Sequence, residues 1–489
     1  MSSSAAPRKQ ERDFSKEVKA LIPQVTELAK NNQLQEAVDK LLVLEKQTRN
    51  ASDLASTSTI LTTIPNLCYK ASNYGLLGSS VVLLAKRHGQ LKEAVVKMMD
   101  EVLGYLPAIK EKEGVEQWLE LIKTFRGVTE GKIHLELPRA RLTVLLSKHH
   151  ELLAQTAPPP STETSTVSAT APKSTTSSSE PEKEKEPVSS KEHLDRAADL
   201  LSELQVETYS SMERREKTEF ILEQMRLESQ RGNWTRVRVG GRKINRAHLK
   251  EDGYTDLKLK FYSLIIALAL EEDAFLDACK AYQEVYDTDE VKNDEAKAKE
   301  ALEMVAYFVI LAVYDNEQSD MLHKLFHDKK MEKVALQHEL LKSFTTRELM
   351  RWPGIETLYG PTLRASSVFS ANDKKGESRW EVLHNRVIEH NIRVVAEYYT
   401  RITIGRLAEL LDLPEERTEL VLCRLVVAKT VYARIDRLAG VIIFDAKKSG
   451  DDVLNEWSGN LEKMLGLIEK TSHLINKEYA VHAAKVISK

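Results

Sequence analysis

The sequence changes character close to its C-terminal end. From about residue 16 onward, apolar residues recur every three or four positions, which is the spacing of amphipathic helices. Residues 384–445 instead contain short helical patterns followed by two brief β-type segments, 431–435 and 441–444, with a turn between them. A helix–turn–helix that leads into a β-hairpin is the layout of a winged helix. The chain is therefore predicted to be mainly α, a helical array that ends in a winged helix.

Composition favours helices and argues against two classes of partner. Gly (19) and Pro (14) are scarce among 489 residues, which suits long helical regions. Lys and Arg (71) nearly balance Asp and Glu (74), so the net charge indicates neither nucleic acid nor an anionic membrane as a partner. The N-terminus has no apolar signal segment, and the apolar runs are much shorter than the roughly 20 residues of a membrane span. We expect a soluble intracellular protein.

One internal repeat is visible. Residues 33–40 (QLQEAVDK) return as 90–97 (QLKEAVVK), each after a turn that contains Asn or Gly. Small and apolar residues at this spacing share one helical face and let neighbouring helices approach closely, as in stacked helical hairpins. We interpret the two copies as parts of a TPR-like solenoid. The alternative is a coincidence between two amphipathic helices, since only two copies are clear.

A segment of different composition interrupts the helical pattern. Residues 156–190 are rich in Ser, Thr and Pro and have no aromatic residue, so they cannot bury enough apolar area to offset the entropy of ordering. The predicted domains are a disordered N-terminus (1–15), an N-terminal helical-repeat solenoid (16–155), a disordered Ser/Thr/Pro-rich linker or insertion (156–190), further helical repeats (191–383), the winged helix (384–445) and a C-terminal helix (450–489).

Motifs for catalysis, cofactors or metals are incomplete. His150 and His338 each begin a His-Glu-x-x-His pattern but lack the second His, which leaves too few zinc ligands. The glycines of 127–132 lack the spacing and the Ser or Thr of a phosphate loop. Gly240 and Gly241 lack a third glycine and a preceding strand, and we expect a loop between helices there. We predict no enzyme activity, no cofactor and no metal site.

Three further features favour structural roles. The cysteines (Cys68, Cys279, Cys423) are far apart and fall in helical patterns, which indicates reduced core residues. The basic residues of 231–250 are interpreted as a solvated face that pairs with nearby acids or with an acidic protein partner, with a nucleic-acid patch as the alternative. Proline and glycine at 352–361 predict a turn region, and Trp352 before it is expected to fill a core gap.

The winged helix is not expected to bind DNA. Its would-be recognition helix, 414–429, carries Glu415, Glu416 and Glu419, and acids at the end that would enter the groove repel phosphates. The apolar strand 441–444 is instead expected to expose an unpaired edge, and such edges pair with strands of other chains. Wing-to-wing contact between similar subunits is the use that this edge predicts.

The chain resembles PCI-domain proteins in its helical array with a winged helix and in four blocks of sequence, 314–325, 338–352, 392–404 and 434–444. PCI-domain proteins are subunits of the proteasome lid, the COP9 signalosome and a translation-initiation scaffold, and the chain is most similar to the proteasome lid subunits. The resemblance implies a non-catalytic scaffold in the cytoplasm and nucleus, within a hetero-oligomer. It implies other PCI lid subunits, MPN-type deubiquitinase subunits, the ATPase ring and the core particle as partners. The alternatives are a PCI scaffold subunit of the COP9 signalosome and, less favoured, a winged-helix nucleic-acid-binding regulator.

Two sets of contact residues follow from the pattern and the resemblance. The residues expected at the wing contact are Val431, Ile435, Val441, Ile443 and Phe444. The C-terminal helix has apolar residues at alternating spacings of three and four, which is the seam of a helix bundle. The residues expected at that seam are Leu454, Trp457, Leu461, Met464 and Ile468.

Overall fold

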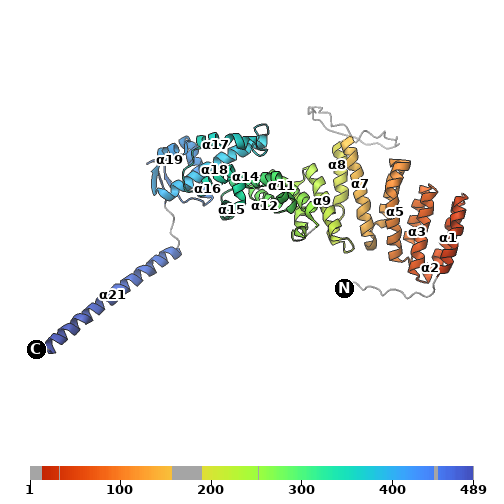
Figure 1. Cartoon of the computed structure of the whole chain (residues 1–489), viewed down its shortest axis with the longest axis horizontal. Coiled ribbons are helices and arrows are strands. Elements are labelled where there is room, and N and C mark those ends of the chain that lie inside the picture. The colour runs from red at the N-terminus through yellow and green to blue at the C-terminus, as the bar shows by residue number, and fades with distance from the viewer. Residues whose placement is uncertain (1–13, 32, 157–189, 252, 445–449, 488–489) are drawn as a thin grey trace, which may run out of the picture. The chain divides into compact units, whose positions relative to one another are not determined.

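The computed structural model describes residues 14–31, 33–156, 190–251, 253–444 and 450–487. These residues form helices almost throughout, with one small sheet near the C-terminal end (Figure 1). The packing divides the chain into two compact units, residues 1–271 and 272–489. Almost all of the predicted disordered N-terminus and of the 156–190 segment lies outside the described residues.

The first unit is a row of helices in which neighbours along the chain lie side by side (Figure 1). Its elements are α1 Ser15–Lys30, α2 Leu34–Asn50, α3 Leu54–Lys70, α4 Tyr74–Lys86, α5 Lys92–Glu113, α6 Val115–Thr129, η1 Ile133–Leu135, α7 Glu136–Thr156, α8 Ser190–Ser202, η2 Val206–Thr208, α9 Arg214–Arg231, α10 Trp234–Lys243, η3 His248–Lys250 and α11 Thr255–Glu271. One core joins α1 through α7, and a second joins α7, α8 and α9. The unit is a helical-repeat array, as the periodicity predicted.

The two copies of the sequence repeat occupy equivalent places. Ala37 and Val38 lie in the first turns of α2, and Ala94 and Val95 lie in the first turns of α5; all four are buried. Because small side chains at these positions let the neighbouring helix approach closely, both copies pack against α3. The helical-repeat interpretation is confirmed.

The helices on either side of the 157–189 gap pack directly on each other. The Ser147 hydroxyl of α7 donates to the Ala197 carbonyl of α8 at 3.0 Å, and the Ser190 hydroxyl donates to the Ala154 carbonyl at 2.6 Å. The array therefore continues across the gap within a single unit. The predicted domain boundaries themselves stay predictions.

The loop expected at Gly240 and Gly241 is wrong, because both residues lie inside α10. A β-carbon on Gly240 would come within 2.6 Å of the Met225 Cγ of α9, and one on Gly241 within 3.0 Å of the Ile265 Cδ1 of α11. The glycines are thus helical residues whose missing side chains let α10 lie close to two neighbours. Close packing outweighs their low helix propensity.

The second unit contains the remaining helices and the sheet. Its elements are α12 Phe275–Tyr286, α13 Asp289–Asn293, α14 Glu295–Leu311, α15 Asn316–His327, η4 Lys329–Lys333, α16 Ala335–Thr345, α17 Trp352–Ala365, α18 Lys374–Tyr398, β1 Arg401–Thr403, α19 Ile404–Leu411, α20 Glu415–Val427, β2 Arg434–Asp436, β3 Val441–Ile443 and α21 Gly450–Ile487. Helix α14 is its most buried element, with Tyr307 and Phe308 fully enclosed. Asp315 caps α15 by accepting a hydrogen bond from the Asn316 backbone N–H at 2.8 Å.

The turn region expected at 352–361 is also wrong, because these residues form most of α17. Pro353 stands in the first helical turn, where a missing N–H costs nothing. Ile355 packs with Met350 and Val387 in a small core, and the partly buried Trp352 packs against it. The Trp352 ring lies 4.3 Å from the His384 ring and 5.5 Å from the Trp380 ring, centroid to centroid, so its predicted role as a packing residue is confirmed.

Candidate functional site: the winged helix and the C-terminal helix

The winged helix is built around one apolar core. Ile392 and Val395 at the end of α18 pack with Leu407 of α19, Leu422 of α20 and Ile442 of β3. Helix α20 begins after Pro414, which is its N-cap residue, and the acids of its first turn suit the positive end of the helix dipole. The predicted layout of two short helices and a β-hairpin is therefore present.

The sheet differs from the prediction in one respect that matters for contact with a partner. Its strand order is β1-β3-β2, so β3 is the central strand and its two edges are both paired. The expectation that 441–444 exposes a free edge is wrong. The reason is β1, a three-residue strand that the sequence analysis missed because Arg-Ile-Thr is too short to show alternation. The open edges of the sheet belong to β1 and β2.

The five residues expected at the wing contact fall into two groups. Val431 and Phe444 are 4% and 8% exposed and belong to the winged-helix core. Ile435, Val441 and Ile443 are half-buried within the sheet. In the isolated chain, only this second group lies at the surface, and its contact with another subunit stays a prediction.

The apolar residues that are most exposed on the winged helix were not singled out from the sequence. They are Tyr398, Leu420, Val427, Tyr432 and Leu438. Val427 and Leu438 line a shallow groove of about 630 Å³ between α20 and the β2 edge, and Ile435 forms part of its floor. An apolar groove beside an open strand edge is suited to a strand or helix of another protein.

The turn between β2 and β3 is rigidly held. The Asp436 carboxylate accepts hydrogen bonds from the backbone N–H groups of Leu438 and Ala439 at 3.1 and 3.2 Å. Arg437 forms an ion pair with Glu419 of α20 at 2.6 Å, and Gly440 supplies the positive φ of 61° that ends the turn. This geometry presents Leu438 at the tip of the wing with a fixed backbone.

Helix α21 presents apolar side chains to solvent along its whole length. Leu454, Trp457, Leu461, Met464 and Ile468 are all exposed, and Trp457 is 62% exposed. The exposed apolar residues continue as Leu465, Leu467, Leu474, Ile475, Tyr479 and Val481, which the five predicted seam residues do not include. An isolated helix with this much exposed apolar surface indicates a surface for other helices. The contact itself stays a prediction.

The incomplete histidine motifs serve packing. His338 stacks on Phe326 at 5.2 Å between centroids, and its Nε2 lies 3.2 Å from the Phe326 carbonyl oxygen. His150 stacks with His193 at 5.7 Å, and burial lowers the pKa of His150 to about 4. Among the described residues, no three His, Cys, Asp or Glu side chains are grouped so that they could hold a metal ion. Cys68 and Cys279 are buried and Cys423 is half-buried, and all three are free thiols.

The basic cluster at 231–250 pairs largely with neighbouring acids. Arg231 contacts Asp195 at 2.8 Å and Asp199 at 2.7 Å, and Arg236 contacts Glu228 at 2.8 Å. Lys243 contacts Glu207 at 3.0 Å. These ion pairs support the interpretation of the cluster as a face that pairs with nearby acids, and an acidic protein partner for its other basic residues stays a prediction. None of the described helices is long and apolar enough to cross a membrane.

Three family models match successive parts of the chain. Residues 36–294 match the model described as PSMD12/CSN4, N-terminal, and residues 335–446 match the PCI domain. Residues 451–483, which lie in α21, match the 26S proteasome regulatory subunit RPN5 C-terminal domain. The first of these covers more than half of the chain. The third is specific to the proteasome subunit by its description, whereas the first is shared with a second protein.

Similar proteins align with at least nine tenths of the chain. The chain is 39% identical to the 26S proteasome regulatory subunit RPN5 of Saccharomyces cerevisiae over 98% of both chains. It is 40% identical to the 26S proteasome regulatory subunit rpn501 of Schizosaccharomyces pombe over 90% of both chains. It is 36% identical to the 26S proteasome non-ATPase regulatory subunit 12 of Dictyostelium discoideum over 98% of this chain and 97% of that protein.

Proposed function

This chain belongs to the family of 26S proteasome regulatory subunit RPN5 and non-ATPase regulatory subunit 12, and we propose that it is a non-catalytic scaffold subunit of the proteasome regulatory-particle lid. The observation that carries the proposal is the similarity over the whole chain, including the C-terminal helix that matches the RPN5 model. In this role the chain supports ubiquitin-dependent protein degradation through protein–protein contacts.

The proposed partners are the other PCI lid subunits, the MPN-type deubiquitinase subunits, the ATPase ring and the core particle. Two surfaces support contacts of this kind: the α20–β2 groove of the winged helix and the apolar side of α21. The groove and its open edge suit the winged helix of a neighbouring subunit, and α21 suits a bundle of C-terminal helices. The cytoplasm and the nucleus are the proposed compartments.

The alternatives have less support. A COP9 signalosome subunit would fit the shared N-terminal model, but the relatives over the full length are named as proteasome subunits. A nucleic-acid regulator is disfavoured by the acids in the first turn of α20, Glu415 and Glu416, and by the paired basic cluster.

The test is purification of the tagged full-length chain from native extract, with quantitative mass spectrometry of the co-purifying proteins. Lid, ATPase and core-particle subunits in comparable amounts are expected. Signalosome subunits in their place would move the chain to the other complex. A chain recovered alone, or with nucleic acid, would contradict the scaffold proposal itself.

A further inference from the structure

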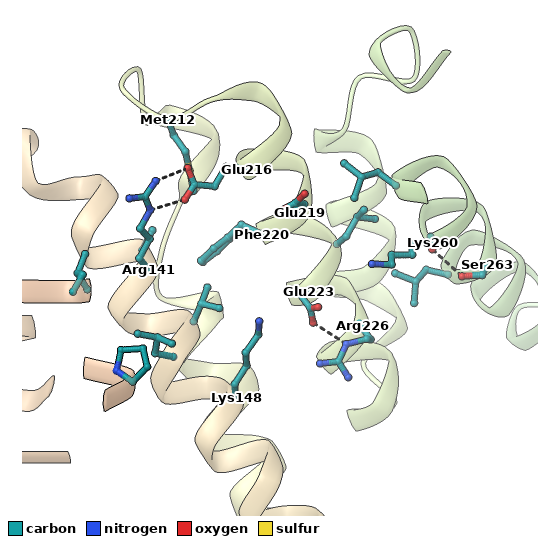
Figure 2. Close-up of a pocket in the computed structure, with 18 residues that line it drawn as sticks. Arg141, Lys148, Met212, Glu216, Glu219, Phe220, Glu223, Arg226, Lys260 and Ser263 are labelled. Carbon is teal, nitrogen blue, oxygen red and sulfur yellow. Dashed lines mark hydrogen bonds and ion pairs between the residues drawn. The ribbon is translucent and has the colours of Figure 1, made fainter. Parts of the chain in front are cut away.

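A further cavity lies within the first unit. Its volume is about 840 Å³, and it opens between α7 and α9, with α5 and α11 contributing to its walls (Figure 2). We call it the α7–α9 groove. Because the wing and α21 belong to the second unit, the proposal below does not depend on their contacts.

Two ion pairs join α7 to α9 at the two ends of this groove. Arg141 of α7 contacts Glu216 of α9 at 2.8 Å, as Figure 2 shows at one end. Arg226 of α9 contacts Glu151 of α7 through two bonds of 2.6 and 2.8 Å at the other end. Ten residues separate the two pairs on each helix, so the helices run parallel and the open stretch is about 15 Å long.

Part of the wall between the ion pairs is apolar. Val144 and Leu145 face the gap from α7, Phe220 and Leu222 line it from α9, and Leu257 and Leu264 line it from α11. A cavity of this size that combines apolar side chains with charged ones is suited to a ligand that is itself amphipathic. It is also as long as about three helical turns, which is the contact length of an amphipathic helix in a groove.

The acidic and the basic side chains at the rim differ in whether they have partners within the chain. Glu216 pairs with Arg141, Glu219 with Arg215 and Glu223 with Arg226. Lys148 and Lys260 extend into the gap from α7 and α11, on opposite sides (Figure 2). Among the described residues, neither ammonium group has a hydrogen-bond acceptor, and Lys148 interacts with Glu151 only through its charge. The acids of the groove therefore have partners within the chain, and its two charged groups without a hydrogen-bond partner are both positive.

From this arrangement we propose that the α7–α9 groove binds an amphipathic helix of another protein, with its apolar stripe in the groove and carboxylates flanking the stripe. The apolar wall receives side chains at i, i+3, i+4 and i+7, and Lys148 and Lys260 each meet one acid of the helix. Two ammonium groups on opposite walls suit a partner with two separated carboxylates better than a ligand with a single anionic head. Nucleic acid is disfavoured, because three glutamates line the same rim.

The test uses the full-length chain and a display library of helical peptides. Positions of the apolar stripe vary among Leu, Ile, Met and Phe, and the flanking positions vary among Glu, Gln and Lys. Selection on the wild-type chain is expected to enrich Glu at the flanking positions. The selected peptides are then measured by fluorescence anisotropy against variants of the chain.

The double variant Lys148→Glu/Lys260→Glu is expected to bind the acidic peptides about tenfold more weakly, or worse, and to gain affinity for the same peptides with Lys at the flanks. Ser263→Trp, which fills the groove from an exposed position, is expected to abolish binding of both. The matched control is Lys40→Glu/Lys97→Glu, which makes the same charge change on exposed residues of α2 and α5 outside the groove. Circular dichroism checks that every variant keeps its helix content.

Three results would overturn the proposal. They are a selection that enriches Lys or no charge, acidic peptides that bind the double lysine variant as well as they bind the wild type, and binding that Ser263→Trp leaves intact. Dodecanoate that binds in the groove where no peptide does would assign it to a small amphipathic anion instead.

Discussion

Gly376 lies in the first turn of α18, where the chain leaves no room for a side chain. A β-carbon there would overlap the carbonyl oxygen of Ser370, and the Ser370 backbone nitrogen would lie only 3.0 Å away. Backbone atoms cannot rotate aside as a side chain can. The close approach of residue 370 to α18 therefore depends on glycine at this position.

Gly376→Ala is expected to destabilise the second unit by about 1–3 kcal/mol, because overpacking against backbone forces the loop before α18 to move. Thermal and urea unfolding of the full chain would measure this. The matched control is Gly354→Ala in the first turn of α17, where no atom lies within 4 Å of the new β-carbon. We expect that change to be neutral or slightly stabilising. Equal losses from the two changes would contradict the explanation.

His390 is a buried titratable residue of α18. It is 6% exposed, its Nε2 faces the Glu348 carbonyl oxygen at 3.3 Å, and burial, with the neighbouring Arg393 charge, lowers its pKa to about 4. The folded chain therefore holds the neutral imidazole, whereas the unfolded chain binds a proton with a pKa near 6.5.

Because the folded pKa is the lower one, the stability that His390 contributes is complete above about pH 6.5 and declines as the pH falls toward 4. Replacing it by Gln is expected to flatten the loss of stability between pH 6.5 and 4, by up to about 3 kcal/mol. His482→Gln on the exposed α21 is the control. Parallel pH curves for wild type and His390→Gln would refute this assignment. His150, with its pKa of about 4, contributes in the same direction.

At the scale of one element, substitutions in α21 are expected to change assembly without changing the fold. Its apolar residues are exposed and make no core in the isolated chain, so changing them leaves the rest of the fold alone. Leu461→Asp/Ile468→Asp is expected to lower the recovery of lid subunits with the tagged chain on the order of tenfold, since losing interface anchors costs 2 kcal/mol or more. The melting temperature of the purified chain should not change.

Lys463→Asp/Lys470→Asp is the matched control for α21, because these residues lie on the opposite side of the helix from Leu461 and Ile468. This change should leave recovery of the lid intact. Normal recovery of the lid with Leu461→Asp/Ile468→Asp would contradict the proposed bundle role of α21.

Substitutions in the winged helix can likewise distinguish effects on assembly from effects on stability. Leu438→Asp at the exposed wing tip is expected to reduce the recovery of a neighbouring PCI subunit about tenfold without changing the unfolding temperature. Val431→Asp is expected to lower the unfolding temperature instead, because it buries a charge in the winged-helix core. Leu358→Asp, an exposed leucine of α17, is the matched control and should affect neither quantity. A Leu438 variant that assembles normally would remove the wing tip from the contact.

At the scale of the whole molecule, the helix packing of the first unit continues across residues 157–189, although the helical sequence pattern is interrupted there. Residues 157–189 separate α7 from α8, yet the ends of these helices meet where the Ser190 hydroxyl donates to the Ala154 carbonyl at 2.6 Å. The core residues of α8, Ala197 and Leu201, pack with Ala140 of α7. The helix packing thus does not require the length of the segment between them.

Replacing residues 157–189 by a Gly/Ser connection of about six residues is expected to leave the unfolding temperature within a few degrees of the wild type. The two helix ends are already adjacent, and a shorter loop has a slightly smaller entropic cost of closure. Differential scanning calorimetry would measure the change. Deleting α8 together with the segment is the contrasting variant, and it should remove a large part of the first unit's stability. A large loss from the replacement alone would mean that the segment takes part in packing.

The helical class, the repeated hairpins and the position of the winged helix could be predicted from the sequence, because helical periodicity and turn residues act over a few positions. That the catalytic motifs are incomplete could also be seen in the sequence, because each motif spans only a few positions. Two predictions failed for different reasons. Gly240 and Gly241 lie in a helix because close packing against α9 and α11 outweighs their low helix propensity. Pro353 lies in the first turn of a helix, where its missing N–H costs nothing.

The candidate contact surfaces depended on tertiary structure. The pairing of β1 with β3 across some forty residues made β3 central and left the open edges on β1 and β2, and burial in the same core enclosed Val431 and Phe444. The α7–α9 groove likewise arises from ion pairs between residues 75 positions apart. A sequence pattern shows which residues are apolar or charged; only the folded chain decides which of them are covered by the protein's own elements and which are left for a partner.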